Sequence, residues 1–284
     1  MKIIDGRAMA EKIKDKIAAE IAGLKGQRPN LAIVLAGERE DSRLYVSLKE
    51  EEAVRVGIDT HSYKCEADTP EEEIIKTIKF LNDDEAIDAI LVQLPLPDNF
   101  NTDKIISAIS PQKDVDGFHP ENLKKFMSTC DHRHVMPPVV EVVLEILKNI
   151  NFVSPDKKAV IIANSEIFGK TLAKALECRG QIVKILKKDD GNLKKLCVES
   201  DLIISAVGEP RLIKGGMIKK DAVIIDIGIS KMDGRICGDV DFESAKEKDC
   251  QLTPVPGGVG PMTIAMAFKN TLELFKKRKK INGN

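Results

Sequence analysis

The sequence carries a tyrosine and a lysine four residues apart, Tyr45 and Lys49, in the pattern Y-x-x-x-K. In a helix this spacing puts the phenol and the ammonium group on the same face. A lysine that loses solvation in a cleft has a pKa lowered toward neutrality, so it can exchange protons during a reaction. The alternative is a half-buried tyrosine beside a surface lysine, and the spacing alone does not decide between the two.

Two further polar residues stand where the chain must turn. Gln93 lies in L-V-Q-L-P-L-P, where two prolines stop a buried strand sharply and leave the glutamine at its carboxyl edge. Proteins of the α/β class bind ligands at that edge. Asp116 lies in K-D-V-D-G-F, in which two acids flank one apolar residue before a glycine that permits a turn. The alternative for this second motif is an ordinary surface turn.

Three glycines and three prolines crowd the stretch 253–263, T-P-V-P-G-G-V-G-P-M-T, ahead of a predicted helix. A loop of this kind has many fixed dihedral angles and can turn its backbone amides toward a ligand. A plain linker, which is the alternative, rarely needs such restriction. The candidate ligand contacts in this loop are Pro256, Gly257, Gly258, Val259 and Gly260.

Helix and strand patterns alternate along the chain and must position these residues. Apolar residues three and four apart predict helices, whereas short alternating or wholly apolar runs predict strands. The predicted helices cover residues 9–24, 42–56, 167–178 and 263–277, with another beginning near residue 70. The predicted strands cover residues 31–35, 60–65, 87–92, 159–163, 182–186, 202–206 and 222–227. Continuous apolar runs such as L-I-I-S-A-V are typical of parallel strands covered by helices on both faces, as in a doubly wound sheet.

The length of 284 residues, with 43% hydrophobic and 31% charged residues, predicts two α/β cores. Prolines, histidines and short polar residues interrupt the periodicity between Asp116 and Val139, which predicts the boundary there. We expect an N-terminal α/β domain over residues 1–122, completed by a returning C-terminal helix in 264–284. A Rossmann-type doubly wound domain is expected over residues 123–263.

Charge and composition exclude several classes of partner. A net charge of -1 argues against nucleic acid or an anionic membrane as the main partner. No run approaches the roughly 18 apolar residues of a membrane span, and the first residues lack a signal-peptide pattern, so we expect a cytoplasmic protein. The cluster Cys130, His132 and His134 offers metal-ligand types but lacks a fourth ligand at the usual spacing, so no metal site is expected.

Five motifs together resemble the bifunctional methylenetetrahydrofolate dehydrogenase/cyclohydrolase family, and they occur in the same order. They are Y-V-S-L-K, L-V-Q-L-P-L-P, K-D-V-D-G-F, G-D-V-D-F at 238–242 and P-V-P-G-G-V-G-P-M-T. The likeness covers essentially the whole chain, from I-D-G at 4–6 to the last helix. Short-chain dehydrogenases also use Y-x-x-x-K, but their glycine-rich turn after the first strand is absent here.

The resemblance implies oxidation of 5,10-methylenetetrahydrofolate to the methenyl cation by hydride transfer to a nicotinamide, then hydrolysis to 10-formyltetrahydrofolate. This chemistry belongs to one-carbon metabolism and serves purine biosynthesis. The resemblance assigns folate binding to the first domain and nicotinamide binding to the second, and it implies a homodimer assembled through the nicotinamide domains.

The resemblance also implies roles for single residues. Lys49 is the key cyclohydrolase residue, Tyr45 stacks on the folate, and Gln93 and Asp116 complete the site. A carboxylate at Asp116 suits the adjacent N–H donors of a pterin ring, because its oxygens only accept. The loop Pro256–Gly260 walls the pocket.

The chain departs from the family's pattern on the cofactor side. The usual G-R-S, followed after three residues by glycine, is matched by A-N-S at 163–165 and Gly169, so the arginine is absent. V-M-P-P at 135–138 matches a usual P-C-T-P, and K-K at 187–188 matches a usual histidine-serine. The expected cofactor-binding residues are Ala163, Asn164, Ser165, Gly169, Lys187, Lys188 and Ile229.

NADP is the expected cofactor, with Lys187 and Lys188 as point charges for its 2′-phosphate. NAD stays open, because a strand that ended two residues later would bring Asp189 or Asp190 to an unmodified ribose. Two other functions stay open as well: a cyclohydrolase with impaired cofactor binding, and a non-catalytic folate- or nucleotide-binding protein of the same fold.

Overall fold

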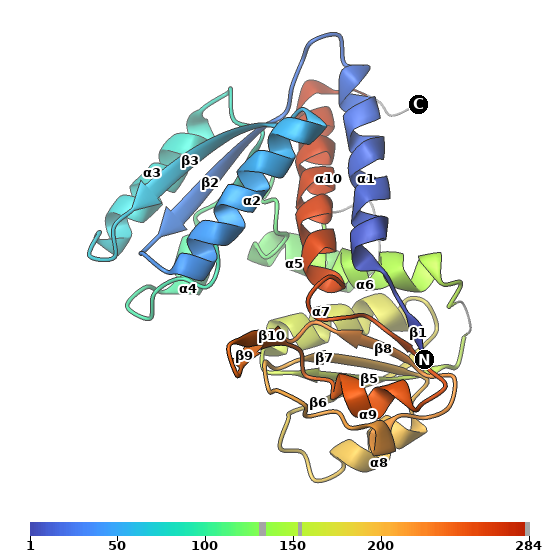
Figure 1. Cartoon of the computed structure of the whole chain (residues 1–284). Coiled ribbons are helices and arrows are strands. Elements are labelled where there is room, and N and C mark those ends of the chain that lie inside the picture. The colour runs from blue at the N-terminus through green and yellow to red at the C-terminus, as the bar shows by residue number, and fades with distance from the viewer. Residues whose placement is uncertain (131–134, 153–154, 282–284) are drawn as a thin grey trace. The chain divides into compact units, whose positions relative to one another are not determined.

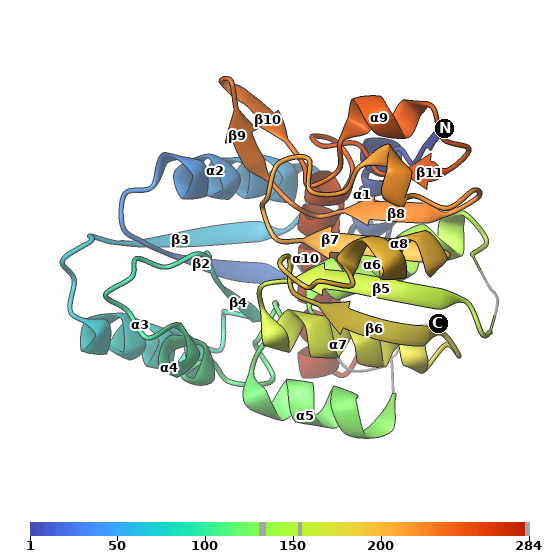
Figure 2. The same cartoon turned by 90° about the horizontal axis from the view of Figure 1, so that it is seen from below.

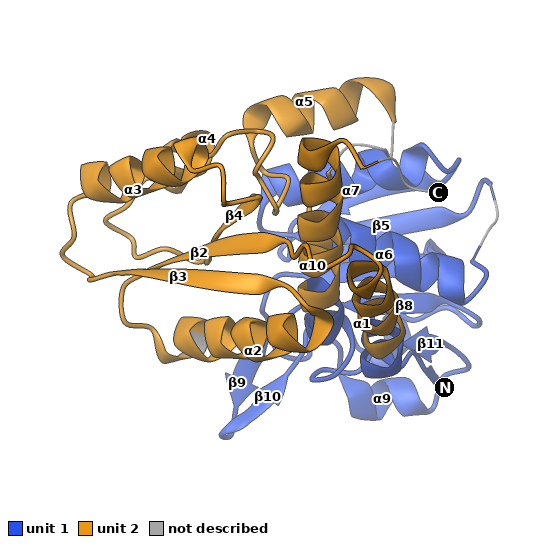
Figure 3. Ribbon diagram, turned by 90° about the horizontal axis from the view of Figure 1, so that it is seen from above, with its two compact units in different colours: residues 1–10, 139–263 blue, residues 11–138, 264–284 orange. Residues whose placement is uncertain are grey.

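The computed structural model describes residues 1–130, 135–152 and 155–281 (Figure 1). The chain divides into two compact units (Figure 3). Unit 1 holds residues 1–10 and 139–263, and unit 2 holds residues 11–138 and 264–284. The units differ from the expected domain ranges in two stretches. Residues 1–10 belong to unit 1, where the first strand joins the large sheet, and residues 123–138 belong to unit 2.

Unit 1 is built on a six-stranded sheet in which every pairing is parallel. In spatial order its strands are β1 (Lys2–Ile3), β11 (Gln251–Leu252), β8 (Val223–Asp226), β7 (Leu202–Ala206), β5 (Lys158–Ala163) and β6 (Ile182–Leu186). The chain passes from β5 to β6 on one side and then returns to β7 on the other. The strand order therefore reverses between β5 and β7, which makes the carboxyl ends of these two strands the switch point of the sheet.

Helices cover both faces of this sheet, as its mainly apolar central strands require. Helices α6 (Pro138–Asn149) and α7 (Glu166–Glu177) lie on one side, and α8 (Leu193–Glu199) and α9 (Phe242–Lys246) lie on the other (Figure 1). A 3-10 turn (Gly215–Met217) and an antiparallel hairpin, β9 (Ser230–Met232) and β10 (Arg235–Cys237), complete the unit. The predicted doubly wound sheet is confirmed.

Unit 2 has a three-stranded parallel sheet in the order β3 (Asp59–Cys65), β2 (Asn30–Ala36) and β4 (Ala89–Val92). Helix α2 (Glu40–Val56) lies on one face, and α3 (Glu71–Asp83) and α4 (Thr102–Ser107) lie on the other (Figure 2). Helix α5 (Pro120–Thr129) follows α4 along the chain.

Two long helices cross from one unit to the other along the chain, α1 (Gly6–Ala22) and α10 (Val259–Lys279). Alternate residues of β2 point to opposite faces of the sheet and belong to two separate hydrophobic cores in unit 2. Leu31, Ile33 and Leu35 pack with α2 and with residues 17–21 and 264–275 of the long helices, whereas Ala32, Val34 and Ala36 pack with α3 and α4. The predicted return of the C-terminal helix to the first domain is thereby confirmed.

The start of α10 was predicted four residues too late. The helix begins at Val259 and not at Thr263, so Pro261 lies within its first turn. Proline is tolerated there because the first backbone N–H groups of a helix have no intrahelical partner. Glycines and prolines at residues 256–261 favour a loop over a helix, so the pattern predicts the later start.

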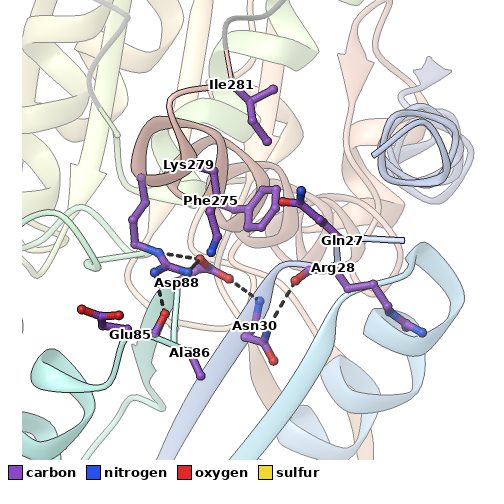
Figure 4. Close-up of a pocket in the computed structure, with 10 residues that line it drawn as sticks. Gln27, Arg28, Asn30, Glu85, Ala86, Asp88, Phe275, Lys279 and Ile281 are labelled. Atoms are coloured by element: carbon purple, nitrogen blue, oxygen red, sulfur yellow. Dashed lines mark hydrogen bonds and ion pairs between the residues drawn. The ribbon is translucent and has the colours of Figure 1, made fainter. Parts of the chain in front are cut away.

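A hollow of about 470 Å³ lies at the amino ends of β2 and β4, at the opposite edge of the sheet from Gln93 (Figure 4). Its floor holds an ion pair between the half-buried Arg278 of α10 and the buried Asp88, which is 1% exposed. Asp88 also accepts a hydrogen bond from the backbone N–H of Asn30 at 2.8 Å, and Arg278 donates to the carbonyl of Glu85 at 2.5 Å. The buried carboxylate of Asp88 requires a charged partner, and Arg278 supplies it. This ion pair links the end of α10 to the sheet.

No helix in the described part of the chain is long and apolar enough to cross a membrane.

Candidate active site

The side chains of Lys49 and Gln93 meet in unit 2. Lys49 Nζ donates a hydrogen bond to Gln93 Oε1 at 2.6 Å. Gln93 is buried and is fixed at both ends: its backbone N–H donates to Val34 O at 2.8 Å, and its Nε2 donates to Leu94 O at 2.7 Å. The glutamine follows the last residue of β4, as the two prolines behind it predicted. The amide therefore has a fixed orientation and presents its oxygen to the lysine.

Burial lowers the pKa of Lys49, and the negative charge of Asp116 opposes that shift. The pKa of Asp116 is raised to about 6, chiefly by burial, with Lys49 lowering it and Asp114 raising it. Lys49 and Asp116 thus act on each other electrostatically. Both have pKa values displaced toward neutrality, which is common for groups that transfer protons or bind ligands in active sites. Tyr45 lies one turn before Lys49 on α2 and is half-buried.

The segment that carries Asp116 is held in place by its neighbours. Residues 113–115 run beside β4, where Ile90 N donates to Lys113 O at 2.7 Å and Val115 N donates to Ile90 O at 3.3 Å. The buried carboxylate of Asp114 accepts hydrogen bonds from His119 N and Asn122 Nδ2, at 2.8 and 3.0 Å. The first aspartate of K-D-V-D-G-F is therefore an anchor for the turn.

Gly117 completes the turn with a φ of +64°, which a side chain rarely adopts. A Cβ atom at this position would also lie 2.8 Å from the backbone of Met136. Asn270 of α10, which is 2% exposed, donates hydrogen bonds to Val115 O and Met136 O at 2.9 and 3.0 Å. This asparagine ties both segments together, and sequence reasoning missed it. The signal was a polar residue inside an otherwise apolar helix stripe.

The glycine-rich loop belongs to unit 1 and not to unit 2. Gly258 N donates to Pro254 O at 2.8 Å, and Arg7 N donates to Gly257 O at 3.1 Å. A Cβ atom on Gly6 would lie 1.8 Å from Gly258 O, so the loop packs against the bare backbone of I-D-G. Pro256, Gly257 and Gly258 form turns, whereas Val259 and Gly260 already belong to α10.

The predicted cofactor residues gather at the switch point of the large sheet. Ala163 ends β5, Asn164 follows, and Ser165 caps α7 by accepting a hydrogen bond from Phe168 N at 3.3 Å. A helix N-terminus at this edge is a ready anion site. Gly169 lets α7 approach β6, because a Cβ atom there would lie 3.1 Å from Ile185.

The chain leaving β6 and the chain leaving β7 both contact this first turn. β6 ends at Leu186, so the two lysines follow the strand directly. Lys187 Nζ donates to Asn164 O at 2.7 Å, and Lys188 pairs with Glu209 at 2.8 Å. Asn164 Nδ2 in turn donates to Val207 O at 2.9 Å.

The remaining predicted positions are Ile229 and the candidate metal ligands Cys130, His132 and His134. Ile229 follows β8 and is 53% exposed. Within the described residues, no group of three or more His, Cys, Asp and Glu side chains could hold a metal ion. His132 and His134 of the candidate cysteine-histidine cluster lie outside the described residues.

Comparison with known proteins identifies both units. Residues 4–116 match the catalytic domain of tetrahydrofolate dehydrogenase/cyclohydrolase, and residues 137–279 match its NAD(P)-binding domain. The chain is 42% identical to the bifunctional protein FolD of Sulfurihydrogenibium sp. and 43% identical to that of Geotalea daltonii, each covering 98% of this chain and 99% of the relative.

Solved structures agree with these sequence matches. The bifunctional FolD enzyme of Campylobacter jejuni superposes with a TM-score of 0.94 at 37% identity, covering 98% of this chain and 99% of that one. The Trypanosoma brucei enzyme, solved in complex with NADP and an inhibitor, superposes with a TM-score of 0.91 at 33% identity, covering 97% of each chain. The chain therefore belongs to the tetrahydrofolate dehydrogenase/cyclohydrolase family.

Proposed function

We propose that the chain oxidises 5,10-methylenetetrahydrofolate to 5,10-methenyltetrahydrofolate with NADP and then hydrolyses that cation to 10-formyltetrahydrofolate. The observation that carries this proposal is the part-buried hydrogen bond between Lys49 and Gln93, with a lysine pKa lowered by desolvation. We place the activity in the cytoplasm, and we assign its product, a one-carbon donor, to purine biosynthesis. Both assignments rest on the family.

The hydrolytic step needs a group that moves protons in both directions. Water adds to the methenyl carbon and must lose a proton, and the ring nitrogen N5 must gain one as its bond to that carbon breaks. An amine whose pKa is lowered toward neutrality can do both. We assign this role to Lys49 and the orientation of its amine to Gln93, whose oxygen accepts the hydrogen bond at 2.6 Å.

Substrate binding is assigned to Tyr45, Gln93 and Asp116 of unit 2. The Asp116 carboxylate accepts from the neighbouring N–H groups of the pterin. The Tyr45 ring, half-buried on α2, offers a face for stacking.

The residues at the switch point of unit 1 fit a dinucleotide. The N-terminus of α7 and the turn at Asn164 suit the pyrophosphate, and Lys187 and Lys188 suit a 2′-phosphate at the tip of β6. Bound there, NADP supplies the hydride acceptor. The absence of the family's arginine favours the alternative of a cyclohydrolase without dehydrogenase activity, and the cofactor experiment below separates the two.

Lys49→Met keeps the length of the side chain and removes the amine, so methenyl hydrolysis is expected to fall at least about 100-fold. Folate affinity should change little, because the aliphatic part of the side chain remains. The rate is measured as loss of methenyltetrahydrofolate absorbance, with Lys16→Met, a change of an exposed lysine on α1, as the control. Hydrolysis at the wild-type rate would remove Lys49 from the mechanism.

Folate affinity should depend on the ionisation of Asp116, whose pKa is raised to about 6. The ionised form accepts hydrogen bonds with both oxygens, so affinity is expected to be full above pH 7 and to fall about tenfold per unit well below pH 6. Asp116→Asn should bind weakly at all pH values and lose this dependence. Calorimetry with 5-formyltetrahydrofolate at several pH values measures this affinity. Glu51→Gln on the exposed side of α2 is the control. A wild-type profile in Asp116→Asn would contradict the assignment.

Cofactor preference tests the lysine pair. Lys187→Ala/Lys188→Ala should lower kcat/KM for NADP about tenfold or more and leave kcat/KM for NAD nearly unchanged, since only NADP carries the phosphate. Lys194→Ala/Lys195→Ala removes two exposed charges from α8 and is the matched control. An NADP preference untouched by the first change would mean that these lysines do not read the phosphate. Methenyl hydrolysis without reduction of either cofactor would support the hydrolase-only alternative.

We also propose a homodimer assembled through unit 1, with β6 as its centre. This strand lies at the edge of the large sheet, and Ile182 and Ile185 on it are 52% and 42% exposed. An edge strand with exposed apolar residues is a template for pairing with a second strand, and a second copy of the same chain supplies one.

Light scattering at micromolar concentration should give twice the mass of one chain for the wild type and for Ile236→Lys. Ile182→Lys is expected to give the mass of one chain, because it places a charge in the contact. Ile236 is equally exposed, on the β9–β10 hairpin, and serves as the control. A wild-type monomer, or a dimer unaffected by Ile182→Lys, would contradict this interface.

A further inference from the structure

The motif G-D-V-D-F at 238–242 contains a carboxylate that the proposed chemistry does not use. Asp239 is 0% exposed. Its Oδ2 accepts hydrogen bonds from Ser205 Oγ at 2.7 Å and Val207 N at 2.9 Å, and its Oδ1 accepts from Glu209 N at 2.8 Å. All three donors belong to β7 or to the loop that follows it. One side chain thus fixes the path of the chain as it leaves β7.

A second buried carboxylate does the same for the neighbouring strand. Asp226 is the last residue of β8, and its Oδ1 accepts from Gly228 N and Asp239 N at 3.1 and 3.0 Å. Its Oδ2 accepts from Val240 N at 2.9 Å. Burial raises the pKa of Asp226 to about 7. We call Asp226 and Asp239 the carboxylate clasp. Asp226 accepts hydrogen bonds from the backbone at Asp239 and Val240, and Asp239 accepts them from the loop after β7.

Two glycines make the clasp possible. A Cβ atom on Gly228 would lie 2.0 Å from Asp239 Oδ1, and a Cβ atom on Gly238 would lie 2.0 Å from Asp226 Oδ2. Each carboxylate therefore sits directly against the Cα atom of a glycine. Any larger residue at either position would push a carboxylate out of place.

The loops held by the clasp reach the switch point of the sheet. Ser230 Oγ donates to Gly208 O at 2.7 Å, which joins the first residue of β9, where the loop after β8 ends, to the loop after β7. Asn164 Nδ2 donates to Val207 O at 2.9 Å, which joins the loop after β7 to the turn after β5. Dinucleotides bind in sheets of this kind at these carboxyl ends. All four carboxylate oxygens of the clasp accept hydrogen bonds from protein donors, so they support the loops at this edge of the sheet.

We propose that Asp239 is a positioning residue for the nicotinamide cofactor, acting through the backbone of residues 207–209. The inference rests on the proposed cofactor site. Asp239 does not touch the cofactor, because its side chain is fully buried. It sets the places of Val207 O, which holds Asn164, and of Glu209, which pairs with Lys188.

Asp239→Asn tests the proposal, because it keeps the shape of the side chain and turns one acceptor into an NH₂ group that faces backbone N–H. The dissociation constant for NADP is expected to rise at least about tenfold, and the KM for NADP with it. Methenyl hydrolysis measured without NADP should stay at the wild-type rate, because Lys49 and Gln93 belong to unit 2. Asp241→Asn is the matched control: it lies in the same motif, is partly exposed and makes no capping hydrogen bond. This variant should bind NADP as the wild type does.

The outcomes separate the two proposals. A wild type that binds no NADP removes the proposed cofactor site itself, whereas a wild type that binds NADP and an Asp239→Asn variant that binds equally well overturn only the positioning role. Parallel loss of NADP binding and methenyl hydrolysis with a lowered Tm would show a purely structural role and would also overturn it.

A milder change covers the case in which Asp239→Asn does not fold. Ser205→Ala removes one of the three donors at a buried position, and it should weaken NADP binding about two- to fivefold while methenyl hydrolysis stays unchanged. No change in NADP binding there would count against the proposal as well.

Discussion

The contact between Lys49 and Gln93 is the constraint on which unit 2 depends. Withdrawing an amine from water lowers its pKa, and this is useful only if the amine is held where a reaction occurs. Gln93 holds it because the glutamine is fixed by hydrogen bonds to Val34 and Leu94. The strand order β3-β2-β4, the helix α2 after β2 and the prolines after Gln93 all serve to bring these two side chains within 2.6 Å.

Buried polar side chains that bind backbone are the common device elsewhere in the molecule. Asp114 holds the turn at 117–119, Asn270 joins residues 115 and 136, and the carboxylate clasp holds the loops after β7 and β8. Each forms hydrogen bonds with backbone donors or acceptors, as buried polar groups generally do, although one oxygen of Asp114, Oδ1, has no partner among the described residues. Loops at the carboxyl edge of a parallel sheet have no ladder of their own, so these side chains supply the rigidity that a binding site needs.

The sequence predicted those features whose signals are local. Apolar or alternating runs located seven of the nine strands of the two sheets to within about two residues, and β6 ended at the predicted residue, directly before Lys187. The two-residue strands β1 and β11 were not predicted, because they are too short to show a pattern. The proline pair correctly placed Gln93 at a strand end. Features that depend on residues far apart in the chain could not be predicted in this way. Asp226 contacts residues 239 and 240, and Asn270 contacts a segment more than 130 residues away, so local patterns do not show which residues these side chains bind.

The departure from the family's pattern at Lys187 and Lys188 falls where the surroundings tolerate it. Lys49 and Asp116 act on each other in surroundings that displace both pKa values, so a change in either would alter the other. Lys187 and Lys188 are exposed at the tip of β6, where water and salt screen charge and a phosphate can be met from several directions. A guanidinium fork requires one geometry, but two ammonium groups on flexible stems do not. Under the proposed cofactor assignment, the two exposed lysines can therefore take over the charge of the arginine that Asn164 replaces, whereas the half-buried pair Lys49 and Asp116 leaves no comparable freedom.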